Sequence, residues 1–116
     1  MFGRRSAQGY RECLDGILAK TLAYGTHTLM TEFILSKGKS LPDHAHPHEQ
    51  IGYLVSGRLR LTIAEETREM APGDSWCVPG NVRHEVYVIE DSKAIEIFSP
   101  RREEYLQYVN PCDIEA

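Results

Sequence analysis

Three of the five histidines in this chain stand within five residues of one another, at His44, His46 and His48. Residues two apart on an extended strand project to the same side, so His44 and His46 can present their imidazoles together. Pro47 lacks a backbone N–H and interrupts strand pairing, which allows Gln50 to turn back toward the two histidines. Imidazole nitrogens and an amide oxygen suit divalent transition metals. The spacing therefore predicts a metal site.

His84 is the candidate for a ligand from elsewhere in the chain. It begins a stretch of alternating apolar residues that is typical of a strand, and a β-barrel can bring this strand opposite the first histidines. Glu49 is the alternative to Gln50 as a ligand, and His48 is expected at the surface or beside the site. We predict that one divalent ion, one of Mn, Fe, Co, Ni or Zn, is bound by His44, His46, Gln50 and His84.

The charge of this ligand set has a chemical consequence. Three neutral imidazoles and an amide oxygen add no negative charge, so a bound ion keeps its full positive charge. Such an ion is a stronger Lewis acid, and attracts an anionic ligand more strongly, than an ion held by a carboxylate. Gln50 therefore favours a small anion as the ligand of this protein.

The elements that must position these side chains are short strands between turns. In 58–64 the apolar residues Leu59, Leu61 and Ile63 alternate with polar ones, which places them on one face of a strand. The expected strands are 27–35, 51–55, 58–64, 75–78, 84–89 and 93–98, with turn residues at 37–38, 56–57, 72–74 and 79–81. Counting an edge strand among the first 25 residues as well, about seven or eight short strands separated by such turns are typical of a β-sandwich or barrel.

The two ends of the chain are expected to differ from this pattern. The first 25 residues contain four of the nine glycines, which argues against a long helix and favours a short arm or edge strand. Helix is expected only over 101–108, with Ser99 as its N-cap and Pro100 as its first residue.

Composition argues against several classes of protein. The 116 residues are enough for one domain, and the formal charge of −4 with scattered basic residues disfavours nucleic acid as a partner. No stretch approaches the ~20 apolar residues that span a bilayer, and the N-terminus does not resemble a secretory signal. The three cysteines are widely spaced, which favours reduced thiols in the cytoplasm.

Glycines and a proline frame both groups of candidate ligands at regular distances. The chain reads Gly38, five residues, His44, one, His46, three, Gln50, six, Gly57, and then Gly73, five, Pro79, four, His84. This resembles the two motifs of the cupin superfamily, G-x5-H-x-H-x3,4-E-x6-G and G-x5-P-x-G-x2-H-x3-N. The resemblance implies an all-β, double-stranded β-helix (a jelly-roll barrel) in one domain over 1–116, with its core at about 26–100. It also implies a metal in the mouth of the barrel.

The departures from these motifs are few. Gln50 stands where cupins usually have glutamate, and the six residues between it and Gly57 favour it over Glu49 as the ligand. Asn81 replaces the glycine of the second motif, but asparagine tolerates the left-handed conformation, so the turn can survive. Val88 replaces the asparagine of that motif, with no evident effect on the metal.

The segment 95–106 has a narrower resemblance. It is similar to the end of small pectin- and alginate-degradation cupins that open 4,5-unsaturated uronates, which carry Asp-x-Phe-Ser-Pro-x-Arg and a His, His, Gln, His metal set. Glu96 stands at the aspartate position, and Phe98 and Arg102 match. The resemblance implies that Glu96 and Arg102 are catalytic and that Phe98 binds substrate.

The chemistry is consistent with that substrate. Arg102 can grip a carboxylate bidentately, the metal can polarise a sugar oxygen, and Glu96 can move a proton if its pKa is raised. Arg60 and Tyr53 are further candidates for substrate binding. Their alternatives are a solvated strand face for Arg60 and aromatic core for Tyr53, while Phe98 can be core and Arg102 a surface charge.

Three functions therefore compete. We favour a metal-dependent enzyme that opens unsaturated uronates, and the alternatives are a protein that only binds a small anion or sugar and a metal-dependent dioxygenase, since fold alone does not decide function. A homodimer is expected because small jelly rolls have exposed sheet edges that association can cover. The segment with Ile17, Leu18 and Leu22 is the candidate contact.

Overall fold

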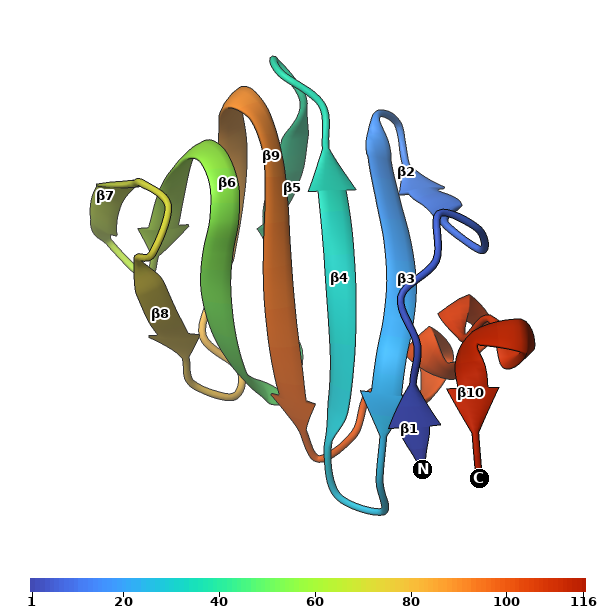
Figure 1. Cartoon of the computed structure of the whole chain (residues 1–116). Coiled ribbons are helices and arrows are strands. Elements are labelled where there is room, and N and C mark those ends of the chain that lie inside the picture. The colour runs from blue at the N-terminus through green and yellow to red at the C-terminus, as the bar shows by residue number, and fades with distance from the viewer.

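The computed structural model describes residues 1–116, and antiparallel strands dominate it (Figure 1). The ten strands and two 3₁₀ helices are β1 (Phe2–Gly3), β2 (Arg11–Leu14), β3 (Ile17–Tyr24), β4 (Leu29–Leu35), β5 (Ser40–His44), β6 (Glu49–Ile63), β7 (Glu66–Met70), β8 (Ser75–Val78), β9 (His84–Ser99), η1 (Glu103–Tyr108), η2 (Pro111–Asp113) and β10 (Ile114–Glu115). Neither helix has the length and apolar character that a membrane crossing needs.

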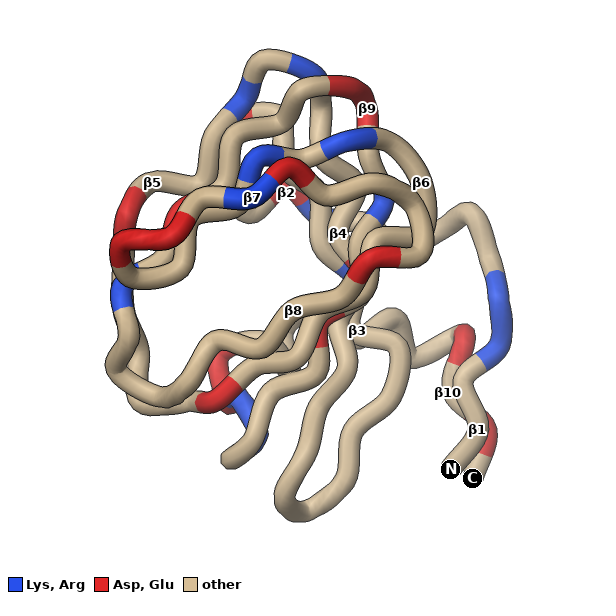
Figure 2. The backbone as a smooth tube through the Cα atoms, turned by 90° about the vertical axis from the view of Figure 1, so that its left-hand side faces the viewer, with Lys and Arg blue, Asp and Glu red and all other residues tan.

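The strands form a jelly roll of two layers. The main sheet has the order β2-β3-β4-β9-β6-β7, with β5 added beside β9 and β8 beside β6. The first half of β6 pairs with the second half of β9, and this pair is flanked by β8 and β4. The second half of β6 pairs with the first half of β9, and this pair is flanked by β7 and β5. Each long strand therefore bends from one layer into the other, and Figure 2 shows the two layers facing each other. The predicted all-β jelly roll is confirmed.

The bend in β6 corrects one expectation from the sequence. The turn predicted at 56–57 does not end a strand, because β6 continues through it with register shifts between Leu54 and Leu59. Gly57 has φ of +92°, and a Cβ there would lie 2.1 Å from the hydroxyl oxygen of Ser92. A bulge of this kind bends a strand while the ladder continues on both sides. Likewise, the expected strands 84–89 and 93–98 are the two halves of β9.

The core lies between the layers and begins earlier in the chain than expected. Alternation along β4 buries Leu29, Thr31, Phe33 and Leu35 on the inner face. Ile17 and Ala19 on β3 are completely buried in the same core, so the core is not limited to 26–100.

Part of the predicted N-terminal arm is thus an internal strand. Ile17 faces the core, because alternate residues of β3 point inward, and it cannot serve as a dimer contact. Leu18 and Leu22, the other residues predicted for that contact, are half-buried.

The C-terminal helix begins later than predicted. Ser99 is still paired with Glu49 in the ladder, so it is not available as a helix cap. Arg102 is extended and stands directly before η1. Tyr105 on η1 packs edge-on against the rings of Phe33 and Phe98, with centroids 6.0 and 5.3 Å away. The helix therefore covers one end of the interior.

The two termini are tied together beside β3. Strand β1 pairs with β10 (Figure 1), and the side chain of Lys20, which is 3% exposed, bonds to both ends of the chain. Its ammonium donates to the carbonyl oxygens of Ser6 at 3.0 Å and Gln8 at 2.9 Å, and to Asp113 Oδ2 at 3.1 Å. The buried lysine is thus fully partnered.

Candidate metal centre

Two paired strands and the loop between β5 and β6 bring the predicted histidines together. His44 is the last residue of β5 and His84 is the first residue of β9, and the two are register partners. His46 lies in the loop that follows β5, and its ring centroid is 5.0 Å from that of His84. One ligand atom from each of the three histidines lies within 4.8 Å of the others. Residues distant in sequence thus form one cluster.

Backbone carbonyls orient all three rings. Each Nδ1 lies within hydrogen-bond distance of a carbonyl oxygen, and a carbonyl only accepts, so each Nδ1 must carry the proton. The pairs are His44 with Pro42 at 2.7 Å, His46 with His48 at 3.0 Å and His84 with Val82 at 2.9 Å. In the neutral form of each imidazole, Nε2 then keeps a lone pair that can bind a metal.

The surroundings keep two of these imidazoles neutral. Burial lowers the pKa of His46 to about 4, helped by the Arg102 guanidinium and by His84. Burial is also the main cause that lowers the pKa of His84. The Nε2 atom of His84 is buried and has no hydrogen-bond partner, which is rare for a polar atom and would be resolved by a bound ion.

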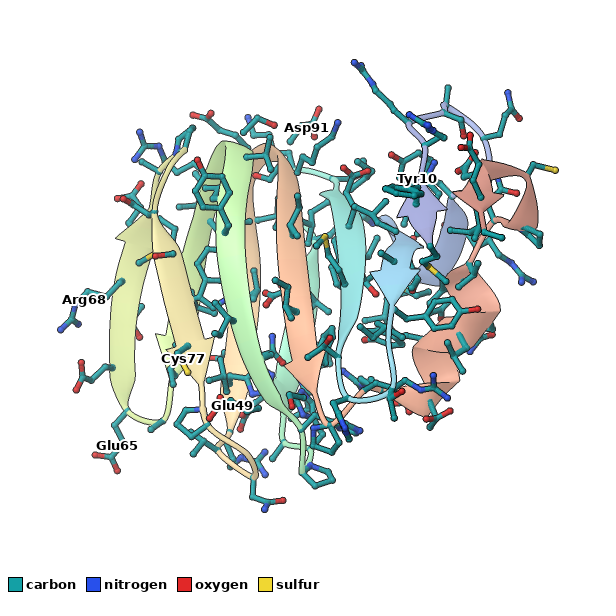
Figure 3. The ribbon with its side chains drawn as sticks, turned by 60° about the horizontal axis from the view of Figure 1, so that its bottom comes forward. Tyr10, Glu49, Glu65, Arg68, Cys77 and Asp91 are labelled. Carbon is teal, nitrogen blue, oxygen red and sulfur yellow. The ribbon has the colours of Figure 1, made fainter.

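Gln50 lies beside the three histidines. Its side chain is buried on the inner face of β6, whereas Glu49, labelled in Figure 3, is exposed because adjacent strand residues point to opposite sides. Gln50 Oε1 lies 2.8 Å from His46 Nε2. Two ligand atoms about 2.1 Å from one ion and at right angles to each other lie about 3 Å apart. The donor set and its spacing therefore fit one divalent ion, with Gln50 rather than Glu49 facing it.

A narrow cavity of about 50 Å³ adjoins the cluster. Its lining residues include His44, Gln50, Trp76, His84, Glu96, Phe98, Arg102 and Tyr105. The half-buried residues of this lining, among them His44, Arg102 and Tyr105, form its mouth, whereas Glu96 and Phe98 are buried. The cavity is thus lined both by candidate metal ligands and by Glu96, Phe98 and Arg102, the residues at the positions of the Asp-x-Phe-Ser-Pro-x-Arg motif.

Glu96 is an acidic side chain held inside the protein. Burial raises its pKa to about 7, and the Trp76 indole and the Gln50 amide oppose that rise. The indole N–H of Trp76 donates to Glu96 Oε1 at 2.9 Å, whereas Oε2 is buried without a partner. The carboxyl group therefore has one occupied and one free oxygen.

Arg102 is held over aromatic rings at the mouth. Its guanidinium carbon lies 4.3 Å from the ring centroid of Tyr105 and 5.4 Å from that of Phe98. Its Nε donates to Glu104 Oε1 at 2.5 Å. This contact uses one edge of the guanidinium, so the terminal nitrogens remain able to bind a carboxylate.

Two predicted substrate-binding residues lie elsewhere. Tyr53 is 49% exposed on the outer face of β6, because it alternates with the inward residues Gly52 and Leu54. Arg60 is exposed, and its guanidinium lies over the outward ring of Tyr87, 5.4 Å from the centroid. Neither residue lines the cavity, which corrects the prediction that they bind substrate there.

Sequence reasoning also left some features of the site unassigned. Trp76 belongs to the buried core and also lines the cavity, where its indole contacts Glu96. Tyr105 carries no motif that marks it, and only the packing of η1 on the sheet brings it to the mouth. His48 is half-buried beside His46, with ring centroids 5.4 Å apart, and lies outside the ligand cluster as expected.

The jelly roll with an internal histidine cluster defines the class of this protein. The cupin domain family matches residues 31–99, so the chain belongs to the cupin family. Among the similar proteins is pectin degradation protein KdgF of Dickeya dadantii (strain 3937), which is 31% identical over 99 residues, 84% of this chain and 90% of that protein. The solved structure of KdgF from Halomonas sp. matches 90% of this chain and 96% of that one, with a TM-score of 0.86 and 29% identity.

A third relative is an isomerase. The H2HPP isomerase of Bacillus subtilis is 33% identical over 87 residues, which is 72% of this chain and 37% of that longer protein.

Proposed function

We propose that this chain is a metal-dependent enzyme that opens the ring of 4,5-unsaturated uronates. The observation that carries the proposal is the convergence of three imidazole nitrogens and one amide oxygen beside a cavity whose mouth holds Arg102. The similarity to two proteins named KdgF, one described as a pectin degradation protein, supports this substrate class.

The charges around the cavity support an anionic substrate. All four candidate metal ligands are neutral, so nothing in the ligand set offsets the charge of a bound ion. Arg102 adds a second positive charge whose terminal nitrogens can bind a carboxylate side-on. A cavity of about 50 Å³ has room for an ion and a few water molecules, so most of the sugar ring would lie at the mouth beside Arg102, with only its reacting end directed inward toward Glu96.

The proposed reaction is an isomerisation in which no net oxidation occurs. When bound, a divalent ion would supply Lewis acidity toward an oxygen of the sugar. Glu96 accepts the proton of the C1 hydroxyl, and the bond between C1 and the ring oxygen breaks, which leaves an aldehyde at C1. The electron pair passes to the enol ether oxygen, and Glu96 returns the proton to C4 so that C5 becomes a ketone. Arg102 holds the carboxylate throughout.

The test is turnover of an unsaturated galacturonate by the purified protein. The protein is loaded separately with Mn, Fe, Co, Ni or Zn, and the ultraviolet absorbance of the conjugated double bond is followed. We expect that absorbance to disappear at a rate that exceeds the same metal without protein, and that His84→Ala abolishes the difference. Saturable binding without turnover would indicate a binding protein instead, and oxygen uptake would indicate a dioxygenase. Either result would refute the proposal.

We also propose that the enzyme works in the cytoplasm. Cys13, Cys77 and Cys112 are all free, and the last two are exposed. Exposed free thiols persist in a reducing compartment.

We further propose that the chain forms a homodimer through the outer face of β6 and β9. Four large apolar side chains are exposed on this face, namely Ile51, Tyr53, Val55 and Ile97. Lys93 stands at one end of the face and Glu49 at the other, and neither has an ion pair within the chain. Two copies packed with these strands antiparallel would bring Lys93 of each copy to Glu49 of the other. The face is thus self-complementary, as a two-fold interface requires.

A further inference from the structure

Three residues on neighbouring strands form one row across the sheet. Gly52 on β6 is the register partner of both Trp76 on β8 and Glu96 on β9. Adjacent strands lie about 4.8 Å apart, so Trp76 must reach across a whole strand to contact Glu96. It does so, because its indole N–H lies 2.9 Å from Glu96 Oε1.

Gly52 makes this crossing geometrically feasible. A Cβ at position 52 would lie 2.1 Å from Cε2 and 2.2 Å from Nε1 of the Trp76 indole. Atoms do not approach this closely, so any other residue at 52 would displace the ring. The glycine therefore provides the space in which the indole lies over β6.

The indole also determines which oxygen of Glu96 is free. An indole N–H can only donate, so Oε1 acts as an acceptor toward Trp76. Oε2 is the oxygen without a partner, and Glu96 lines the cavity beside the ligand cluster. Without the indole, the carboxyl group could rotate and exchange its two oxygens.

We propose that Trp76, lying across Gly52, is a positioning residue that fixes Glu96 so that Oε2 faces the reacting sugar. The proposal rests on the proposed ring-opening function. Trp76 acts through Glu96 and need not touch the substrate. The consequence is that its contribution to the rate exists only while Glu96 is present.

A double-mutant cycle tests this dependence. Trp76→Phe keeps an aromatic ring but removes the N–H, and the loss of a hydrogen bond to a charged group corresponds to a change of about 10- to 100-fold. We expect that loss in kcat with KM and metal content unchanged, and little further loss when Trp76→Phe is added to Glu96→Gln. Equal fold-losses in both backgrounds, or an undiminished kcat, would overturn the proposal. Tyr87→Phe, on the exposed outer face, is the matched control and should retain full activity.

Fluorescence gives a readout that does not depend on activity. Trp76 is the only tryptophan in the chain, so the emission of the whole protein reports its surroundings. We expect the emission to change in Glu96→Gln and in Gly52→Ala, and to be unchanged in Tyr87→Phe. Emission unaffected by Glu96→Gln would contradict the contact even if Trp76→Phe failed to fold. Failure of the proposed function would appear differently, as an absence of turnover by the parent protein with every metal.

Discussion

His44 and His84 face each other at the junction of β5 and β9, with ring centroids 4.2 Å apart. Each ring is oriented by a carbonyl of its own segment, two residues before it in the chain. Local hydrogen bonds thus aim the rings, and the strand ladder brings them together. The ligand cluster is therefore prearranged by backbone structure.

Removing one of these ligands should abolish tight metal binding. His84→Ala leaves three candidate ligand atoms, and we expect a loss of affinity on the order of 100-fold or more, since even outer contacts of a metal site contribute 10- to 100-fold. Isothermal titration with Ni or Zn measures the change. His27→Ala is the matched control because His27 is exposed in the turn between β3 and β4. Similar losses in both variants would rule out the proposed centre.

Adding charge to the ligand set should separate metal binding from substrate binding. In Gln50→Glu a carboxylate would face the ion, so we expect tighter metal binding. We also expect weaker binding of the anionic sugar, seen as a KM raised by roughly tenfold, because the net charge of the site falls by one. Metal titrations and steady-state kinetics measure the two effects. The neighbouring variant Glu49→Gln should change neither, and an effect there comparable to that of Gln50→Glu would return Glu49 to the ligand set.

Arg102 should contribute mainly to binding of the substrate carboxylate. Arg102→Ala removes a charge-assisted pair of hydrogen bonds, which corresponds to about 2 kcal/mol, or a KM raised roughly 30-fold. Arg102→Lys should recover only part of this, because an ammonium cannot bind a carboxylate with two parallel bonds. Arg83→Ala is the control, since Arg83 is an exposed arginine that pairs with Asp43. An unchanged KM in Arg102→Ala would exclude this role.

The protein should become less stable in acid, because protonation of Asp113 removes its ion pair with the buried Lys20. The Ser6 hydroxyl and the Lys20 ammonium hold the pKa of Asp113 below its ordinary value, and Asn110 acts in the same direction. A carboxylate whose pKa is depressed by folding stabilises the protein above its unfolded pKa of about 4, and that contribution is lost as the pH falls through the folded pKa.

Urea unfolding at several pH values measures this contribution. We expect the urea midpoint of the parent protein to decrease when the pH is lowered below about 4. We also expect Asp113→Asn to be less stable than the parent at pH 6, with a smaller difference in stability between the two proteins in acid. A constant difference between the two proteins across this range would contradict the assignment.

The outer face of β6 and β9 should hold the homodimer together. Ile51→Lys places a charge in the middle of the apolar face, and we expect it to yield monomers by light scattering after size-exclusion chromatography. Lys93→Glu should also weaken the dimer, and the added change Glu49→Lys should restore it, because the exchanged charges are again complementary. Leu14→Lys, at an exposed site on β2, is the control. A parent protein that is monomeric at high concentration would refute the interface.

Alternation along strands made part of the site predictable. Glu96 and Phe98 have the same parity in β9, so both point inward together with Ala94. The same rule could have excluded Tyr53, which has the opposite parity to Gln50, and Arg60, which has the opposite parity to Leu59 and Leu61. The prediction that Tyr53 and Arg60 bind substrate was therefore wrong because their pattern was misinterpreted. The alternation of their neighbours already implied that both side chains point outward.

Alternation alone did not predict that β6 and β9 are long continuous strands, nor which residues lie at the mouth of the cavity. A glycine within a β-rich segment is compatible with a reversal or with a bulge, and the pairing of β6 with β9 selects the bulge at Gly57. Tyr105 and Arg102 lie at the mouth only because η1 packs against Phe33 and Phe98.

The sequence by itself determined which atoms could bind a metal and what charge they carry, because ligand type and local spacing are properties of a few neighbouring residues. It also determined the fold class, because alternation and turn residues act locally. Only the tertiary structure decided that His84 lies opposite His44 and that Trp76 reaches Glu96 across Gly52. These relationships depend on the register between strands that are far apart in the chain, and register is decided by the packing of the whole core.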